Sequence, residues 1–567
     1  MNELPRLIWL PALLVCTVAL GLCSQQLAPT HATGPDQTKP SGPDLARPRP
    51  GESSPGAARQ YPASTQAAQV DRPAQSPSGA DRPRAIEQAL QADITARVSK
   101  ALGRVSKESG GAAQDADCRV CFRMIDLESG RVIAERDALR PSESASNMKL
   151  VTTLAALVAL GPGFRFETVA EANGPTQAGV LRGDLILRAA GDPFYSAQGA
   201  DAAKAELGKL ARSVADEGIR TIQGDLIFDA GGFVESGPAP GWPKPEGFWT
   251  ASYGLSSAFT LQGGLVTMTC TPQGLGELCR VELAPWPCGL DLEASVAGIK
   301  GRGNDVRLGL VDVRRELGVS GTYGASNGSF SKAFRHPAPK EMFAAAFQDE
   351  LYKAGIKVQG KQRHASGTPV GRQVAVLSRS WLGLIEPINT DSVNSVADGL
   401  LVAMGHERFG IGSREQGARA VLDVLRELKV DVAGFHQADG SGLSRDNRVH
   451  AELLSELLVY ALELPEQIAQ VFLDSLALAG ETGTLERRML DGVARGRVRA
   501  KTGWIKGASS LSGVAETLRG RRIAFSMLVN YPRVNGLNNS VWKPMLDDIC
   551  ERLVQDGVRS ESDRTVR

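Results

Sequence analysis

The chain has 567 residues, of which 42% are hydrophobic, which is enough for two or three domains. Its 64 Lys and Arg balance 63 Asp and Glu to a net charge of +1, so no basic excess indicates nucleic-acid binding. Six His in so long a chain argue against a His-rich metal enzyme.

Residues 1–23 are predicted to be an export signal. The apolar run from Leu7 to Leu22 follows Arg6, contains Pro11 and is short for a membrane span. An uncleaved anchor is the alternative. The run ends in LGLC, which resembles a lipoprotein signal, although Leu22 is bulkier than the small residue such signals carry. We therefore expect an exported protein of the periplasm or cell envelope, either cleaved or lipid-anchored through Cys23.

Residues 24–84 are rich in Pro, Gly, Ser, Gln and Ala and are predicted to be a disordered tether, because they hold too few apolar side chains for a core. Apolar residues at helical spacing follow from Arg84 to Arg104. CRVCFRMIDL and RVIAERDA around ESG predict a strand–turn–strand unit, and an apolar helix is predicted to begin near Ser146.

The composition changes in residues 163–369, which are rich in Gly, Asp and short apolar runs such as LRGDLILRAAGDP. This pattern predicts small β-rich units. Helices return in residues 370–567, and the chain closes with three strands and a helix near Trp542. The two early strands and three late ones can form one antiparallel sheet with both terminal helices on one face. We therefore predict an α/β (α+β) catalytic domain, split into 85–162 and 370–567, with residues 163–369 inserted.

Eight cysteines are present, and six lie beyond the signal. In an exported chain these six favour structural disulfides, with fifteen possible connectivities. Cys118 and Cys121 are not expected to bond to each other, because positions three apart on a strand face opposite sides. Cys270, Cys279 and Cys288 lack the close pairs of a zinc site, so disulfides are the prediction for them.

The stretch SASNMKLVTT places Ser146 three residues before Lys149 at a predicted helix start. On a helix these side chains are neighbours, and a lysine of lowered pKa can take the proton of a serine nucleophile. Free N–H groups at the helix N-terminus can bind an oxyanion. Alone, the pattern is more simply explained as a helix cap followed by a solvated lysine.

Two further motifs follow along the chain. DSVNSVAD supplies Ser392 for proton relay and Asn394 for a substrate carbonyl. AKTG, on a predicted strand, supplies Lys501 and Thr502 for a carboxylate, and Gly503 leaves room beside an extended peptide. A turn, a cap or a solvated strand end explains each motif alone. The ordered set S-x-x-K, S-x-N and K-T-G is far more specific, because it is the set of penicillin-interacting serine enzymes.

From about Arg84 onward the chain resembles the D-alanyl-D-alanine carboxypeptidase/endopeptidase family, the class C low-molecular-mass penicillin-binding proteins of the penicillin-binding protein 4 type. The segment DGSGLSRDNRV (Asp439 to Val449) and the long insert between the first two motifs add to the resemblance. It implies a penicillin-binding transpeptidase/β-lactamase-like domain interrupted by two small β-rich domains. It also implies action on peptidoglycan stem peptides, with β-lactam antibiotics as covalent inhibitors and no metal or organic cofactor.

The resemblance implies roles for residues that match the family motifs. Ser146 is the acylated nucleophile and Lys149 its general base, while the N–H groups of Ser146 and Trp504 form the oxyanion hole. Arg445 matches a position that meets the diaminopimelate end of the peptide. Asp229, in GDLIFDAGGF, matches an inserted-domain residue near the same ligand, and a strand-end turn aspartate is its alternative.

Three residues depart from the family pattern. Val393 replaces the usual aspartate of the second motif, and activity is expected to survive because that residue does not carry the proposed chemistry. Trp504 is bulky beside the cleft, and Lys506 stands where glutamine is common. Two other functions compete: a β-lactamase or esterase on the same fold, or a catalytically decayed wall-binding protein. The retained Ser and Lys residues argue against decay.

Overall fold

The computed structural model describes residues 81–235, 237–242, 253–255, 257–312 and 316–555. The predicted export signal, Cys23 and nearly all of the predicted tether lie outside these residues. Helix α1 (Asp81–Leu102) begins inside the segment predicted as tether, with Pro83 in its first turn, where proline is tolerated. Within the described ranges, no helix is both long enough and apolar enough to cross a membrane.

A six-stranded sheet of strand order β18-β19-β20-β21-β1-β2 joins the two ends of the described chain. All of its neighbouring strands are antiparallel. The predicted antiparallel sheet is therefore confirmed, with one short edge strand added. The strands are β1 (Arg119–Asp126), β2 (Val132–Arg136), β18 (Ala477–Leu478), β19 (Val498–Ile505), β20 (Ala508–Glu516) and β21 (Arg522–Asn530).

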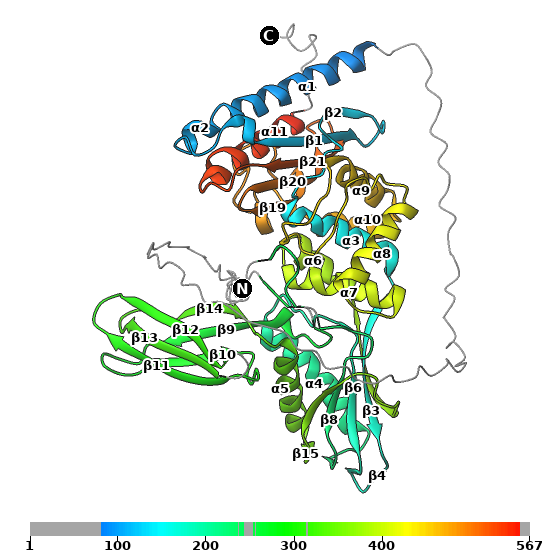
Figure 1. The fold of residues 1–567 in the computed structure, drawn as a ribbon, viewed down its shortest axis with the longest axis vertical. Helices are drawn as coiled ribbons and strands as arrows, with labels where there is room; N and C mark the ends of the chain where they lie inside the picture. The colour runs from blue at the N-terminus through cyan, green and yellow to red at the C-terminus, as the bar shows by residue number, and fades with distance from the viewer. Residues whose placement is uncertain (1–80, 236, 243–252, 256, 313–315, 556–567) are drawn as a thin grey trace, which may run out of the picture. The chain divides into compact units, whose positions relative to one another are not determined.

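Helices cover both faces of this sheet (Figure 1). Helices α1 and α11 (Lys543–Val554) pack on one face, where Phe122 and Phe525 are buried. Helices α3 (Met148–Ala159) and α9 (Ala451–Glu463) pack on the other face against Ala524 and Leu528. Because both faces are covered, the central strands β20 and β21 are buried along nearly their whole length. Both terminal helices lie on one face, as predicted.

Helices α6, α7, α8 and α10 pack in the same apolar cluster as α3, whereas the short α2 packs on the other face of the sheet. Those at α7, α8 and α9 were expected from their apolar spacing, whereas the short α10 was not. The helices are α2 (Val105–Glu108), α6 (Ile385–Asn389), α7 (Asn394–Phe409), α8 (Arg414–Glu427) and α10 (Glu466–Asp474).

The insert begins with a five-stranded sheet of order β16-β8-β6-β3-β17 and a small four-stranded sheet of order β15-β7-β5-β4. Two long helices, α4 (Ala200–Asp216) and α5 (Pro339–Lys353), pack with it and were not expected from the sequence. The strands are β3 (Arg165–Asn173), β4 (Thr176–Gln177), β5 (Val180–Leu181), β6 (Asp184–Arg188), β7 (Thr221–Ile222), β8 (Leu226–Asp229), β15 (Lys357–Val358), β16 (Gln362–Ala365) and β17 (Arg372–Ser380).

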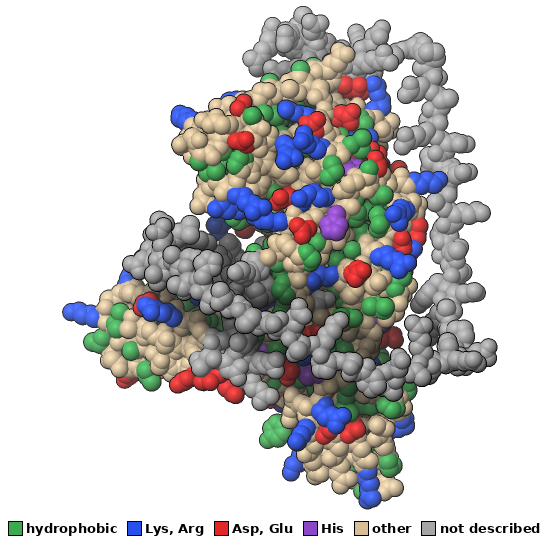
Figure 2. Space-filling model, in the orientation of Figure 1, with side chains coloured by type: hydrophobic (Ala, Val, Ile, Leu, Met, Phe, Trp, Pro, Cys, Tyr) green, Lys and Arg blue, Asp and Glu red, His purple; other side chains and the backbone are tan. Residues whose placement is uncertain are grey.

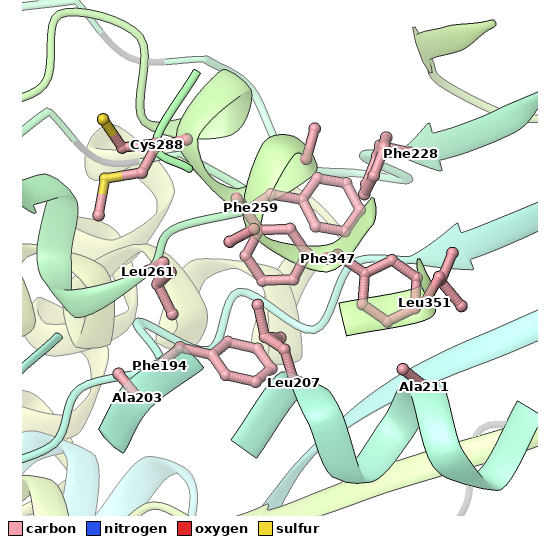
Figure 3. Packing of buried hydrophobic residues seen from close by; sticks show 14 of the residues in the cluster. Phe194, Ala203, Leu207, Ala211, Phe228, Phe259, Leu261, Cys288, Phe347 and Leu351 are labelled. Atoms are coloured by element: carbon pink, nitrogen blue, oxygen red, sulfur yellow. The ribbon is translucent and has the colours of Figure 1, made fainter. Parts of the chain in front are cut away.

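Aromatic rings fill the core between this sheet and its helices. Figure 3 shows Phe228, Phe259 and Phe347 beside Leu207 of α4. The Phe228 ring lies edge-on to Phe259, with centroids 5.5 Å apart, and edge-on to Phe347 at 6.5 Å. Such pairs add to the gain from burial alone, so the insert has a dense core of its own.

A second group of strands in the insert forms two three-stranded sheets, β10-β9-β14 and β11-β13-β12. These strands are β9 (Leu265–Thr271), β10 (Arg280–Ala284), β11 (Asp291–Ile299), β12 (Asn304–Asp312), β13 (Glu316–Gly324) and β14 (Phe330–Arg335). Since β17 pairs with β3 over the full length of both strands, we propose that the insert runs to about residue 380 instead of 369. On the face drawn in Figure 2, acidic and basic side chains are intermixed, as the balanced charge leads one to expect.

The predicted disulfides are wrong for this structure. All six cysteines of the described ranges are free. They are divided among three separate cores: Cys121 packs with α3 and α9, Cys118 and Cys550 lie on the opposite face of the sheet, and the other three lie in the insert. Thiols act here as small apolar groups. Cys118 and Cys121 do lie on opposite faces, as predicted.

Candidate active site

Ser146 lies in a single 3₁₀ turn (Ala145–Asn147) that leads directly into α3. Ala145, just before it, has φ 46°, a left-handed conformation that is strained for a side chain with a Cβ. The Asn147 amide donates to the carbonyl of Lys501 at 2.8 Å and so ties this turn to β19. The hydroxyl of Ser146 is therefore held at the junction of a helix start and a strand, and is itself half-buried.

Lys149 is fully buried one helical turn after Ser146. Its Nζ lies 3.2 Å from Ser146 Oγ, 2.5 Å from Asn394 Oδ1 and 2.6 Å from the carbonyl oxygen of Ser441. Burial lowers the pKa of Lys149 to about 8, against the opposing effect of Asp398 and Asp439. A neutral amine is therefore accessible close to physiological pH.

The second motif meets the first through Asn394, the first residue of α7. Ser392, two residues earlier, is half-buried and has φ 62°, a second left-handed residue with a Cβ. Such residues cost about 1–3 kcal/mol and cluster at functional sites. Val393, where the family carries aspartate, instead packs against the apolar cluster of the helices. Val393 therefore packs on the apolar side, away from the polar groups around Lys149 Nζ.

Lys501 lies on β19 and is also fully buried. Its Nζ donates to the carbonyl of Thr502 at 3.0 Å. Burial, and next the charge of Lys149, hold the pKa of Lys501 well below its usual value, while Asp391 acts in the opposite direction. The hydroxyl of Thr502 donates to that of Thr484 at 2.8 Å.

Gly503 lies where two parts of the site approach each other closely. A Cβ at this position would lie 2.1 Å from Ser510 Oγ, 2.7 Å from the carbonyl oxygen of Ser144 and 3.1 Å from the Ser146 nitrogen. The absent side chain therefore lets β19 approach the nucleophile turn itself. Trp504 follows with 60% of its surface exposed, beside this contact.

Arg445 lies at the margin of the cluster. Its guanidinium pairs with Glu143 at 3.1 Å and donates to the carbonyl of Lys506 at 2.7 Å. A polar pocket of about 270 Å³ opens beside it, lined also by Tyr531 and Gly507. The structure therefore brings Arg445 and Lys506 together, next to the third motif.

Asp229 is the predicted site residue that the structure does not bring into this cluster. It ends β8 and is fully buried. Its two oxygens accept hydrogen bonds from Arg188, Thr368, Gly231 and Gly367, all of them within the insert. The strand-end alternative fits these contacts, since every acceptor of the carboxylate is already in use.

Several groups at the site were not singled out from the sequence. Two of them are backbone carbonyls, of Ser441 and Lys501, which carry no signature in residue type. A third is Asp398, buried behind Lys149 on α7. It did have a signal: in DSVNSVAD it stands four residues after Asn394, on the same helical face.

The sequence pattern of the D-Ala-D-Ala carboxypeptidase 3 (S13) family matches residues 112–550, most of the chain. The chain belongs to this family. It is therefore a serine peptidase, and the predicted resemblance is confirmed. It is 31% identical over 424 residues to a D-alanyl-D-alanine carboxypeptidase of an Actinomadura species, covering 72% of this chain and 77% of the relative.

Other family members are similar as well. D-alanyl-D-alanine carboxypeptidase DacB of Haemophilus influenzae is 26% identical over 420 residues, covering 72% of this chain and 85% of the relative. The crystal structure of penicillin-binding protein 4 from the same organism matches with a TM-score of 0.66 at 23% identity, covering 80% of this chain and 98% of that one. This likeness confirms the predicted fold.

Proposed function

We propose that this family member is a cell-envelope D-Ala-D-Ala carboxypeptidase that forms an acyl-enzyme on Ser146. The observation that carries the proposal is the set of contacts around Lys149 Nζ. A neutral amine has two N–H groups and one lone pair. Asn394 Oδ1 and the Ser441 carbonyl can accept only N–H groups, so the lone pair is left for the Ser146 hydroxyl.

Acylation follows from this arrangement. Ser146 gives its proton to Lys149 Nζ while its Oγ attacks the carbonyl carbon of the penultimate D-alanine. Negative charge develops on the carbonyl oxygen and is stabilised by the N–H groups of Ser146 and Trp504. Ser392 relays the proton from Lys149 to the departing amine as the peptide bond breaks. Water then hydrolyses the ester and restores Ser146.

Lys501 and Thr502 bind the terminal carboxylate of the substrate. Burial disfavours the ammonium form of Lys501 in the empty site, and an arriving carboxylate restores it. A charged Lys501 in turn disfavours the ammonium form of Lys149, because like charges repel. Substrate binding therefore favours the free base on Lys149 at the moment it is needed.

The relatives named as carboxypeptidases support action on the D-Ala-D-Ala end of cell-wall stem peptides. A cross-linked diaminopimelate as leaving group would make the same chemistry an endopeptidase reaction, with Arg445 near that end of the substrate. We further propose that the protein is exported and works in the periplasm or envelope, and that its N-terminus, with Cys23, provides any membrane attachment.

The test is mass spectrometry of the purified full chain after brief exposure to benzylpenicillin. A lasting adduct mapped to Ser146, absent from Ser146→Ala, is the expected result. An unmodified protein with hydrolysed penicillin in solution would assign a β-lactamase instead. An unmodified protein with intact penicillin would assign a non-enzymatic wall-binding protein.

A further inference from the structure

The chain segment 439–442 is held tightly against Lys149. Both backbone polar groups of Gly440 are hydrogen-bonded: its N–H donates to Asp398 Oδ1 at 2.7 Å, and its carbonyl accepts from Thr152 Oγ1 at 2.8 Å. The next carbonyl, of Ser441, accepts from Lys149 Nζ. A Cβ on Gly440 would lie 2.4 Å from the carbonyl oxygen of Ala397, so no side chain fits here.

Helices α3 and α7 each hold this site through two side chains that lie about one helical turn apart. On α3, Lys149 and Thr152 lie three residues apart and contact successive peptide units of the segment. On α7, Asn394 and Asp398 lie four residues apart, so Asn394 meets Lys149 Nζ directly and Asp398 lies one turn behind it. Asp398 is thus built into the support of the general base without touching the reacting atoms.

Asp398 is fully buried, yet only one of its oxygens is used. Within the part of the chain that the structure describes, its Oδ2 has no hydrogen-bond partner. The neighbouring carboxylate of Asp439, by contrast, accepts from Gly442 N, Ser444 N, Asn447 Nδ2 and Trp242 Nε1. A buried carboxylate oxygen without a hydrogen bond destabilises the folded state, so its presence calls for a functional explanation.

We propose that Asp398 is a positioning residue for acylation: it fixes the 439–442 segment against Lys149 through the Gly440 N–H, and its charge governs how readily Lys149 gives up its proton. The proposal rests on the role of Lys149 as general base. Each element packed around Asp398 carries a charged group that acts on it. These groups are Lys149 on α3, Asp439 on the 439–442 segment, Arg414 on α8 and Arg335 on β14.

The protonation equilibria agree with this geometry. Burial, and next Asp439, raise the pKa of Asp398 to about 7, while the pKa of Lys149 is lowered to about 8. Between about pH 7 and pH 8 the two groups hold one proton between them, and that proton can lie on either group. With the proton on Asp398, Lys149 is a free base; with the proton on Lys149, the Asp398 carboxylate stabilises the ammonium. Lys501, once a carboxylate has restored its charge, favours the first arrangement.

The test measures the rate of Ser146 acylation by benzylpenicillin against pH in the full chain and in Asp398→Asn. The asparagine amide keeps an acceptor for the Gly440 N–H and removes the charge. Without the carboxylate the ammonium of Lys149 loses stabilisation, so the midpoint of the acidic limb should move to lower pH by about half a unit. Below about pH 7 Asp398 is itself protonated, so the two profiles should converge there and differ most between about pH 7 and pH 8. The plateau falls, since a weaker base is a poorer catalyst.

Thr152→Val is the matched control. It removes the other bond to Gly440 with no change of charge, so we expect slower acylation at every pH with an unmoved limb. Should Asp398→Asn fail to fold, Asp398→Ser removes the same charge, and the same shift is expected. An unmoved limb in a folded Asp398 variant, or an equal shift in Thr152→Val, would overturn the inference alone. Wild-type protein that forms no Ser146 adduct would overturn the proposed function, and with it this inference.

Discussion

Two buried aspartates show how the insert and the catalytic part differ. Asp229 in the insert accepts hydrogen bonds on both oxygens, including one from Arg188, and its pKa lies below the usual value despite its burial. Asp398 beside Lys149 accepts one bond, and its pKa is raised to about 7. The two carboxylates are equally inaccessible to solvent. Burial raises the pKa of both carboxyl groups, and at Asp229 the hydrogen bonds it accepts outweigh that effect.

The buried lysines of the insert and of the catalytic part differ in their partners in the same way. Lys204 in the insert contacts the carboxylate of Asp349 and the carbonyl of Trp286. Lys149 and Lys501 are fully buried, and neither of them has a carboxylate among its hydrogen-bond partners in the described ranges. A fully paired buried charge is held in one protonation state, whereas incomplete pairing allows a proton to move.

The largest expected effect comes from Lys149→Ala. Without the amine, the Ser146 hydroxyl has no base, so acylation by benzylpenicillin should fall by at least about a thousandfold. The hydrogen-bond partners of Nζ are uncharged, and burial of an incompletely paired amine is itself unfavourable, so the thermal unfolding midpoint should stay close to that of the wild type. Acylation rates and a melting curve measure both. A variant that unfolds would show that Lys149 is structural, and the contrast with Lys204 would disappear.

Gly503→Ala is expected to rank second. Its Cβ would enter the space occupied by Ser510 Oγ and the Ser144 carbonyl and would push β19 away from the nucleophile turn. We expect acylation to fall by roughly a hundredfold, because displacements near 1 Å have that effect. Leu511→Ile is the control, because this neighbouring side chain packs on the opposite face of the sheet, in the cluster with α1 and α11. Wild-type rates in Gly503→Ala would mean that the close approach does not matter.

Asp229→Asn should affect stability without affecting chemistry. It removes one of the two carboxylates paired with Arg188 and leaves Glu171 as the other, at a cost of about 2 kcal/mol in the free energy of unfolding. Because the folded pKa of Asp229 is lowered, its contribution is present above the unfolded value near 3.9 and is lost as pH falls through the folded pKa. Denaturant titrations should therefore show the gap between wild type and variant narrowing below about pH 4.

The pH profile of acylation is the companion measurement for Asp229→Asn. It should overlay that of the wild type, in contrast to Asp398→Asn. A shifted limb would show that Asp229 acts on the reaction, as the family resemblance allowed.

The smallest effect is expected from Val393→Asp, which restores the residue usual in the family. Val393 is the N-cap of α7 and makes no capping bond. Aspartate there would gain about 1 kcal/mol as a cap and lose a similar amount of apolar packing. We expect stability to change by less than about 1 kcal/mol and acylation by less than about threefold. A larger gain in rate would show that Val393 restrains the site.

The sequence by itself determined much of this protein. Apolar periodicity identified the terminal helices and the strands of the central sheet, because amphipathic patterns are local properties of the chain. Ser146 and Lys149 could be paired in advance, since three residues on a helix place side chains together. The order of three motifs identified the family. Helices α4 and α5 were missed among the Gly-rich runs of the insert.

Tertiary structure alone decided which partners each charged group received. Asn394 and the Ser441 carbonyl reach Lys149 from positions 245 and 292 residues away, and a carbonyl looks the same in every residue. Asp229 and Asp398 are the same residue type, so only their surroundings could separate a structural carboxylate from one beside the general base. Burial and pairing depend on the whole fold, whereas residue type and spacing do not.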